Sequence, residues 1–476
     1  MMSVILRYQC RRAAKAVVSV VAVAVVIVVL FISNPSSSPV DLLGVLPPPA
    51  FNGLHSQRRH VLGERGRYKD YAGADNDALL DAIFVSAQPP TPGASAAQSS
   101  CRPARHIMFL KTHKCASSSV QNLFLRYGLL HNLTFALPAA GNYLGNPILF
   151  KAGMVARNLL PPEGVVDIFA VHTRLNPSEH RKVLHPDTIF LTVVRDPSLL
   201  FESLYNYFHL GKFYEDAPLE EFLTLPLEMQ MELRKRSGRF GHNMMLFDMG
   251  MEMHSNITAI EIRRAIDQAD EMFDLVLIAE KMDESLILLK ELLCWDYRDM
   301  IFFSKNARRD NVKPDLSVSA IERMRELNSG DVLLYDHFLA RHEQTVLRYG
   351  TEKMANEVAS LRALREEFFE YCGTHVVDGF DADDVFREYS NQVNGYVLDN
   401  RADLDCLLLS LPELSLIKKI RKNQQNTAID FERMSLLYKE NFELDGQSNA
   451  LDNTFITHPG GELMLQGINN TFYDST

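Results

Sequence analysis

The segment His106–Leu110 (HIMFL) runs without a break into Lys111–Ser119 (KTHKCASSS), and a helical pattern begins near Val120. A short apolar run followed by a polar loop and a helix predicts a buried strand that leads into a helix N-terminus. Such a terminus exposes unpaired N–H groups and the positive end of the helix dipole, so it suits a phosphate or a related anion. Lys111 and Lys114 add positive charge, and the serines add hydroxyl donors.

The same loop also has a purely structural interpretation, which is a turn whose serine caps the following helix. No glycine occurs between Lys111 and Ser119. The ordinary nucleotide-binding P-loop, with its glycines and terminal Gly-Lys-Ser/Thr, is therefore absent. The loop by itself indicates an anion site without identifying the anion.

Three more apolar runs along the chain are each followed by a turn and a helical pattern. With the first run they predict strands over His106–Leu110, Val165–Val171, Thr188–Val194 and Asp274–Ala279. The helices that follow are predicted over Val120–Tyr127, Ser178–Leu184, Ser198–Phe208 and Asp283–Leu293. This alternation favours an α/β fold with a parallel sheet flanked by helices. Later helices are predicted over Ser317–Asn328, Asp331–Leu347 and Asn356–Tyr371, and no structure is predicted after about Leu404.

Polar residues end two of the predicted strands, where ligands of parallel sheets bind. Arg195 ends the third strand and Ser203 follows on the next helix, so both can converge on one anion. The alternative is a structural ion pair of Arg195 with Asp196 or Glu202. His172 ends the second strand, and an ordinary pKa of about 6.5 leaves a histidine able to accept a proton at neutral pH. Its structural alternative is a histidine that only satisfies local hydrogen bonds.

Composition limits the class of protein. The 476 residues are 46% hydrophobic and 23% charged, and the formal charge is −11. These values exclude wholesale disorder, and six cysteines are too few for a small disulfide scaffold. The acidic balance argues against a general nucleic-acid binder, and no nucleic-acid partner is expected. Residues 1–15 hold four basic residues and no acid, so the rest of the chain carries 45 basic against 60 acidic residues.

Ala16–Ile32 is an apolar run of the length that crosses a thin membrane. Because the basic cluster lies only on its N-terminal side, the run predicts a signal anchor with a cytosolic N-terminus and a lumenal body, a type II membrane protein. A cleaved signal peptide is the alternative, although Phe31–Pro35 offers a poor cleavage site. Residues 33–100, rich in Pro, Ala, Ser and Gln toward their end, are typical of a stem.

The predicted organisation is therefore a tail over 1–15, an anchor over 16–32, a stem over 33–100, a catalytic domain over 101–404 and a C-terminal segment over 405–476 of uncertain structure. Lumenal exposure predicts N-glycosylation at the sequons of Asn132, Asn256 and Asn469. Five cysteines follow the anchor, so at least one is a free thiol or bridges two chains, and their pairing stays open.

Several segments in order resemble one family. The loop Leu110–Ser119 is similar to the 5′-phosphosulfate-binding loop of Golgi galactose 3-O-sulfotransferases, the galactosylceramide sulfotransferase family. Thr192–Pro197, with Phe201, Ser203 and Tyr205, resembles the family's 3′-phosphate-binding segment. Further similar segments are Asn243–Gly250, Phe273–Trp295 and Leu334–Phe338, and the resemblance covers about residues 101–345. Tail, anchor and stem match the family's architecture.

The resemblance implies transfer of a sulfuryl group from 3′-phosphoadenylyl sulfate (PAPS) to the 3-hydroxyl of terminal β-galactose. The acceptor would be a glycolipid such as galactosylceramide or a glycan, and no metal is expected. Lys114 would stabilise charge on the leaving phosphate, His172 is the first choice as general base and His113 the second. The implied donor-binding residues are Lys111, Thr112, His113, Lys114, Cys115, Ala116, Ser117, Ser118, Ser119, Arg195 and Ser203. A homodimer stays open.

Cys115 departs from the family pattern, because related loops usually carry threonine, serine or another small residue there. We expect weaker but retained donor binding, and Cys115 is the natural unpaired thiol. Two other functions compete with the sulfotransferase hypothesis. A non-catalytic lumenal nucleotide- or glycan-binding protein would not need Lys114, Arg195 and His172 together, and an ATP phosphotransferase would need a P-loop pattern that is missing.

Overall fold

The computed structural model describes residues 101–237, 241–253, 257–303, 316–382, 385–388 and 393–427. The predicted anchor and stem, Asn256 and Asn469 lie outside these ranges. None of the described helices has both the length and the apolar character needed to cross a bilayer.

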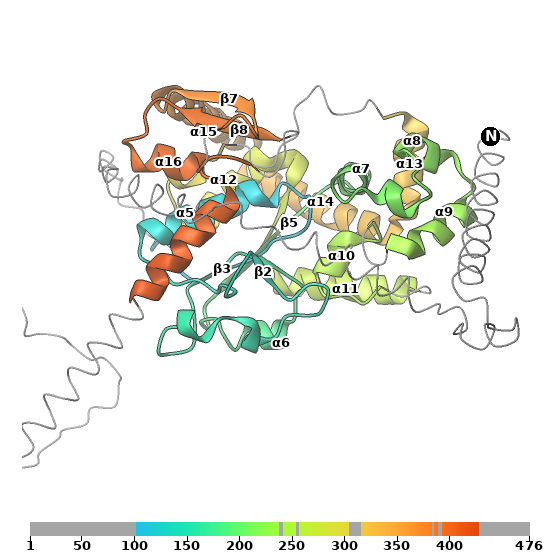
Figure 1. Cartoon of the computed structure of the whole chain (residues 1–476), viewed down its shortest axis with the longest axis horizontal. Coiled ribbons are helices and arrows are strands. Elements are labelled where there is room, and N and C mark those ends of the chain that lie inside the picture. The colour runs from blue at the N-terminus through green and yellow to red at the C-terminus, as the bar shows by residue number, and fades with distance from the viewer. Residues whose placement is uncertain are drawn as a thin grey trace, which may run out of the picture. The chain divides into compact units, whose positions relative to one another are not determined.

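A four-stranded parallel sheet forms the centre of the fold, in the order β3-β1-β5-β6. Its strands are β1 (Ile107–Leu110), β3 (Ile168–Phe169), β5 (Ile189–Val194) and β6 (Leu275–Ile278). Each lies within one of the four predicted runs, so the predicted α/β class and parallel sheet are confirmed. Figure 1 shows helices on both sides of this sheet.

The second strand is much shorter than the predicted Val165–Val171. Only Ile168 and Phe169 pair with β1, while Val166 forms an isolated bridge with Leu184. The chain then leaves the main sheet, and β4 (His172–Thr173) pairs in parallel with β2 (Tyr143–Leu144). This departure is what places His172 beside Tyr143.

The helices predicted after the strands are present with shifted ends. The α-helices are α5 (Ser117–Leu130), α6 (Pro177–His180), α7 (Pro197–Tyr207), α8 (Leu219–Thr224), α9 (Leu227–Arg234), α10 (Met244–Asp248), α11 (Ala259–Met272), α12 (Met282–Leu293), α13 (Val318–Leu327), α14 (Ser329–Tyr349), α15 (Thr351–Tyr371) and α16 (Leu404–Ser410). Short 3-10 helices are η1 (Ala152–Met154), η2 (Arg157–Leu159), η3 (Leu210–Phe213), η4 (Lys235–Ser237), η5 (Ala279–Lys281) and η6 (Tyr297–Met300). A hairpin pairs β7 (Thr374–Asp378) with β8 (Asn394–Leu398).

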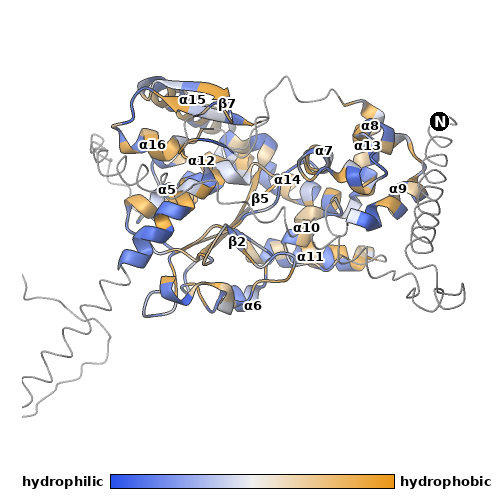
Figure 2. Ribbon diagram, in the orientation of Figure 1, coloured by the Kyte–Doolittle hydropathy of each residue, from blue (hydrophilic) through white to orange (hydrophobic). Residues whose placement is uncertain are grey.

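Burial of apolar side chains explains why the sheet forms where it does. All four residues of β1 are fully buried, as are Leu191, Val193 and Val194 of β5. Figure 2 shows the central strands as hydrophobic, with hydrophilic residues on the outer helices. Burying each large aliphatic side chain contributes about 1.5–3 kcal/mol. A charged substitution within β1 would therefore cost both this contribution and the desolvation of the charge.

Most residues between 405 and 427, whose structure the sequence leaves uncertain, are helical, and the compact unit that contains the sheet extends to Gln425. Helix α16 packs on α5, where the Asn122 side chain donates to the carbonyl of Leu408. A further helix over 413–427 follows. The physical reason for this extension is burial, because Leu407, Leu408, Leu416 and Ile417 lie in the core.

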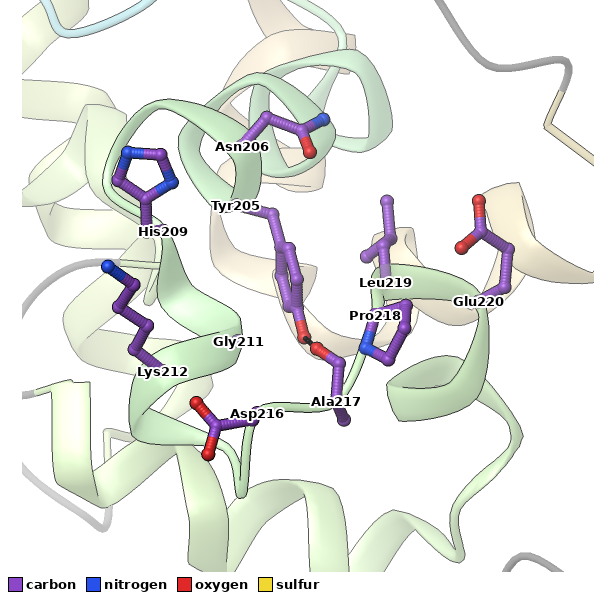
Figure 3. Close-up of a pocket in the computed structure, with 10 residues that line it drawn as sticks. All are labelled: Tyr205, Asn206, His209, Gly211, Lys212, Asp216, Ala217, Pro218, Leu219 and Glu220. Carbon is purple, nitrogen blue, oxygen red and sulfur yellow. Dashed lines mark hydrogen bonds between the residues drawn. The ribbon is translucent and has the colours of Figure 1, made fainter.

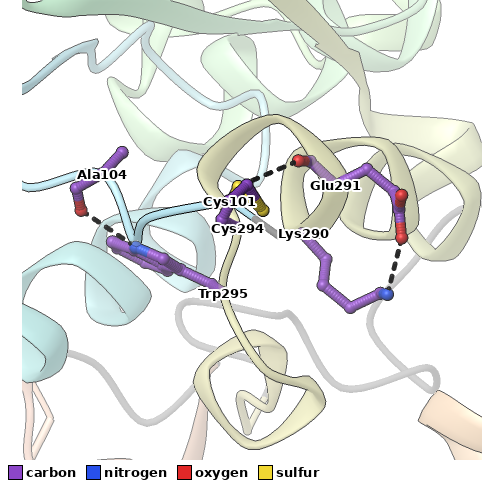
Figure 4. Close-up of a disulfide and its surroundings, with 6 residues drawn as sticks. All are labelled: Cys101, Ala104, Lys290, Glu291, Cys294 and Trp295. Atoms are coloured by element: carbon purple, nitrogen blue, oxygen red, sulfur yellow. Dashed lines mark hydrogen bonds and ion pairs between the residues drawn. A yellow bond between two sulfur atoms is a disulfide. The ribbon is translucent and has the colours of Figure 1, made fainter. Parts of the chain in front are cut away.

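Two disulfides pair four of the five cysteines that follow the predicted anchor. Cys101–Cys294 joins the segment before β1 to the end of α12, beside Trp295, whose indole N–H donates to the carbonyl of Ala104 (Figure 4). Cys372–Cys406 joins the end of α15 to α16. Cys115 is the free, buried thiol, as expected.

Candidate functional site

The loop between β1 and α5 adopts left-handed backbone conformations at Lys114 and Ala116, with φ values of 60° and 59°. Ala116 occupies the N-cap position of α5, and no side chain caps that helix. The alternative of a serine-capped turn is therefore wrong. A helix start without a side-chain cap keeps its end available to an anion.

Three side chains of the loop point inward and brace it. The Thr112 hydroxyl donates to the carbonyl of Val193 at 2.6 Å, and the Ser117 hydroxyl donates to the carbonyl of Thr112 at 2.6 Å. The Cys115 thiol lies 3.3 Å from the carbonyl of His113, and burial raises its pKa. These residues fix the loop conformation, so their contribution to an anion site would come from backbone N–H groups.

Lys114 and Arg195 meet at this loop. The ammonium of Lys114 lies 3.9 Å from the centre of the Tyr207 ring, a cation–π contact. The Arg195 guanidinium donates to the carbonyl of Lys114 at 2.8 Å. Strand β5 thus delivers its terminal arginine to the loop that follows β1.

The alternative ion pairs of Arg195 with Asp196 or Glu202 do not form within the described part of the chain. Asp196 pairs instead with Arg325, at 2.5 Å, and also caps α7. Glu202 accepts a hydrogen bond from Asn206. Ser203 lies buried on α7, and no described side chain joins it to Arg195.

The ring of His172 stacks with two neighbouring rings. Its centroid lies 4.5 Å from that of His113 and 4.7 Å from that of Tyr143. The Nδ1 atom of His172 lies 3.2 Å from the carbonyl oxygen of Lys111. Because a carbonyl only accepts, Nδ1 carries the proton and Nε2 keeps its lone pair. Burial, together with the positive charges of Lys111, His113 and Lys114, lowers the pKa of His172 well below 6.5.

His113 is held by a buried carboxylate. Its Nδ1 lies 2.9 Å from Asp248, and its backbone N–H donates to the same carboxylate at 2.7 Å. Asp248 ends helix α10 and is fully buried. The Tyr143 hydroxyl lies 3.4 Å from Nε2 of His113. The site thus holds two stacked histidines, of which one is oriented by a carboxylate and the other by a backbone carbonyl.

Lys111 is buried and pairs with Glu413, at the start of the C-terminal helix, with the ammonium 2.5 Å from the carboxylate. Glu413 also accepts hydrogen bonds from the Asn142 amide at 2.7 Å and from the Ser118 hydroxyl at 3.3 Å. Burial opposes ionisation of Glu413, but the charge and hydrogen bond of Lys111 and the hydrogen bonds of Asn142 and Gln121 together outweigh it and lower the pKa of the carboxyl. The helix over 413–427 is therefore tied to the anion-binding loop.

Sequence reasoning missed Asp248, Glu413, Tyr143 and Tyr207. Asp248 could have been found, because it lies inside Asn243–Gly250, a segment that resembles the family. Tyr207 lies on the helix that follows Arg195, one turn beyond Ser203. Glu413 had no signal, because nothing local to the sequence links it to a loop 302 residues earlier.

An open cleft of about 450 Å³ lies beside the end of α7, lined by α7, η3 and the start of α8. Tyr205 crosses this cleft and donates to the carbonyl of Ala217 at 2.7 Å (Figure 3). None of the predicted donor-binding or catalytic residues lines it. Tyr207, whose ring contacts the Lys114 ammonium, is the neighbour of the lining residue Asn206 on α7.

Of the three predicted glycosylation sites, the structure describes Asn132. It is exposed, lies just after α5 and has a positive φ of 53°. The Thr134 of its sequon donates to the carboxylate of Asp167 at 2.7 Å. The exposure of Asn132 is compatible with a glycan.

Sequence comparisons with known proteins identify the family of this chain. The family model for galactose-3-O-sulfotransferase matches residues 74–424. Galactosylceramide sulfotransferase of Mus musculus is 37% identical over 287 residues, which are 59% of this chain and 66% of that protein. The Homo sapiens protein of the same name is 37% identical over 285 residues, which are 58% of this chain and 67% of that protein.

A third relative is matched over more of its length. Galactose-3-O-sulfotransferase 2 of Sus scrofa is 33% identical over 341 residues, which are 68% of this chain and 85% of that protein. The family match runs past the predicted limit of 404, in agreement with the compact unit that includes the start of the C-terminal helix. These matches confirm the predicted resemblance and do not favour the non-catalytic or phosphotransferase alternative, and the chain belongs to the galactose-3-O-sulfotransferase family.

Proposed function

We propose that this protein transfers the sulfuryl group of PAPS to the 3-hydroxyl of a terminal β-galactose on a glycolipid, such as galactosylceramide, or on a glycan. The observation that carries the proposal is the convergence of Lys114, Arg195 and two stacked histidines at the carboxyl edge of the sheet. Relatives named galactosylceramide sulfotransferase and galactose-3-O-sulfotransferase support the reaction and the sugar.

The loop after β1 fits the anionic donor by its chemistry. The start of α5 carries no side-chain cap, and Lys114 and Arg195 add two cations beside it. When bound, PAPS supplies an activated sulfuryl group on a phosphate leaving group. Lys114 would stabilise the negative charge that grows on that phosphate, while Arg195 and Ser203 would hold the 3′-phosphate. Fixed cations at developing charge are commonly the largest single contribution to such reactions.

His172 suits the role of general base toward the galactose hydroxyl. Its Nδ1–H is directed to the Lys111 carbonyl, so Nε2 is left to accept a proton. Its lowered pKa keeps the ring neutral at the pH of the secretory pathway. His113 is the second candidate, since Asp248 fixes the orientation of its ring.

Glu413 acts as a positioning residue in this proposal. Its carboxylate holds the side chains of Lys111 and Asn142. The backbone carbonyls of these two residues contact His172, because the Lys111 carbonyl lies at its Nδ1 and the Asn142 carbonyl accepts its backbone N–H at 3.0 Å. Glu413 therefore orders the backbone beside His172. Ser118, on the first turn of α5, is held by the same carboxylate.

The testing experiment incubates the purified full chain with labelled PAPS and a panel of acceptors. Galactosylceramide, lactosylceramide and β-galactosides should yield 3-O-sulfated products, and the same acceptors with the 3-hydroxyl blocked should not. If the protein binds PAPS normally but sulfates no galactose-terminated acceptor, the assigned acceptor is wrong. The acceptor that gives the highest kcat/KM identifies the physiological class.

We also propose a Golgi location, with Ala16–Ile32 as a signal anchor and the catalytic domain in the lumen. The basic residues before that run and the two disulfides support an oxidising, lumenal environment. In sealed microsomes, Asn132 should carry a glycan removable by endoglycosidase only after detergent is added. An unglycosylated, protease-accessible catalytic domain would contradict the proposed topology.

A further inference from the structure

We propose a divalent transition-metal site at the amino edge of the sheet, formed by His106, Asp167 and His185. Each residue offers one ligand atom, and these atoms all lie within 4.8 Å of one another. Nε2 of His106 lies 3.5 Å from Oδ1 of Asp167, and Nε2 of His185 lies 3.9 Å from the same oxygen. In a tetrahedral zinc site with bonds of about 2.0–2.1 Å, neighbouring ligand atoms stand roughly 3.3–3.4 Å apart.

The two ring nitrogens of His106 face two carboxylates. Nδ1 lies 2.7 Å from the Asp187 carboxylate, and because a carboxylate accepts, Nδ1 carries a proton. Nε2 faces Oδ1 of Asp167 at a distance longer than an ordinary hydrogen bond. A separation of this size fits two ligand atoms of one metal ion better than a direct hydrogen bond.

Asp167 is oriented for this role by its other oxygen. Oδ2 accepts from both the N–H and the hydroxyl of Thr134, each at 2.7 Å, which leaves Oδ1 directed toward the histidines. Asp187 would serve as the partner that orients His106, an arrangement that most metal-bound histidines have. An imidazole pair with one carboxylate favours zinc and neighbouring transition metals over calcium or magnesium.

The framework beneath the site is rigid. His106 immediately precedes β1, Asp167 immediately precedes β3, and His185 begins the turn before β5. That turn is closed by the Thr188 hydroxyl, which donates to the carbonyl of His185 at 2.7 Å. The two histidine rings are stacked, with centroids 3.9 Å apart and an interplanar angle of 16°, so one ring would have to turn to direct both nitrogens at one ion. A metal here would join the amino ends of three strands without contacting the carboxyl edge.

The test measures zinc bound by the chelator-stripped full chain, using ZnCl₂ as the probe and a competing indicator. We expect one Zn²⁺ per chain at this site and a higher melting temperature with zinc, because a ligand that binds only the folded state stabilises it. His185→Asn and Asp167→Asn should weaken binding at least ~10-fold, and Asp187→Asn should weaken it by about 10-fold. The matched control, His375→Asn, changes an exposed histidine that also contacts an aspartate and should leave binding unchanged.

The inference is overturned if the unmodified protein binds no zinc, or if His185→Asn binds it as tightly as the unmodified chain. Because a variant can fail to fold, Co²⁺ bound to the unmodified protein provides a second measurement. Its spectrum should show tetrahedral or five-coordinate d–d bands without thiolate-to-cobalt charge transfer. A thiolate band would place the metal on a cysteine and overturn the assignment.

Discussion

The two edges of the parallel sheet carry similar residues in different surroundings. At the carboxyl edge, His113 and His172 stack with centroids 4.5 Å apart, and Asp248 holds one ring. At the amino edge, His106 and His185 stack at 3.9 Å, and Asp187 holds one ring. The residue types alone would not distinguish them.

The neighbouring charges separate the two edges. Lys111 and Lys114 lower the pKa of His172, and Arg195 reaches the same loop. The surroundings therefore favour anions and a neutral His172. At the amino edge, within the described part of the chain, the charged partners of the histidines are the carboxylates of Asp167 and Asp187, which favour a cation. In the two proposals, the pairing of histidine with carboxylate would therefore serve proton transfer at one edge and metal binding at the other.

The largest expected effect comes from removing the main cation of the carboxyl edge. Lys114→Ala should lower kcat by about 10²–10³-fold, since fixed charges at a developing oxyanion contribute on that scale. The control Lys182→Ala removes a lysine that is 59% exposed and paired with Glu179, and it should keep normal activity. Rates are measured with labelled donor, and melting curves check folding. Near-normal turnover of a folded Lys114→Ala protein would refute the role of the loop.

Replacing the proposed base should have the next largest effect. His172→Gln should lower kcat by ~10²-fold, the lower range for general base catalysis. A base works only when unprotonated, so the rate falls as pH drops through its folded-state pKa. Because the pKa of His172 is lowered, the acid limb of the kcat/KM profile should lie below pH 6.5.

The two carboxyl-edge histidines can be told apart by the same profiles. His172→Gln should abolish that acid limb, whereas His113→Gln should keep it while lowering the rate. The opposite pattern, with the limb lost only in His113→Gln, would make the His113–Asp248 pair the base.

Breaking the tie to the C-terminal helix should have an intermediate effect. Glu413→Gln leaves the Lys111 ammonium buried without its counter-charge, and such a change typically costs about 3–5 kcal/mol. Glu413 is 14% exposed, so we expect the low end of that range, with a lower melting temperature and weaker donor binding. Glu179→Gln, which breaks the Lys182 surface pair, is the matched control and should change stability by less than about 1 kcal/mol.

The donor-binding measurement on Glu413→Gln has a clear contrary outcome. If the carboxylate competes with PAPS for Lys111 and Ser118, the variant will bind donor more tightly than the unmodified chain. That result would show that Glu413 inhibits donor binding and does not position the donor site.

Strand positions and strand-end residues could be predicted because they depend on local patterns. The apolar runs located all four strands of the sheet, and the residues at their carboxyl ends included Lys111, His172 and Arg195. His106 and Asp167 lie within the first half of two of the same runs and His185 lies three residues before a third, so their convergence at the amino edge could also have been predicted from a parallel sheet.

Glu413 and the shortening of β3 could not be predicted, because both depend on packing between distant segments. The partner of Lys111 lies on a helix 302 residues away, and its position is set by the burial of α16 against α5. Similarly, β3 ends early because β4 pairs with β2, whose two residues carry no strand pattern of their own. The disulfide pairs also required the fold, since five cysteines permit many pairings.

The smallest expected effect concerns Cys115, whose reactivity tests whether the cations of the carboxyl edge stabilise a buried thiolate. Arg195 favours the thiolate, but burial dominates and raises the pKa of Cys115, so the thiol should be unreactive. Alkylation of the native protein should leave the peptide containing Cys115 unmodified by mass spectrometry, and denaturation should expose it. Cys115→Ser restores a hydroxyl that donates within the loop and should change the KM for donor by no more than about 3-fold, the scale of one hydrogen bond. Rapid alkylation in the folded state would show that the loop opens to solvent, or that its positive charges outweigh burial at this thiol.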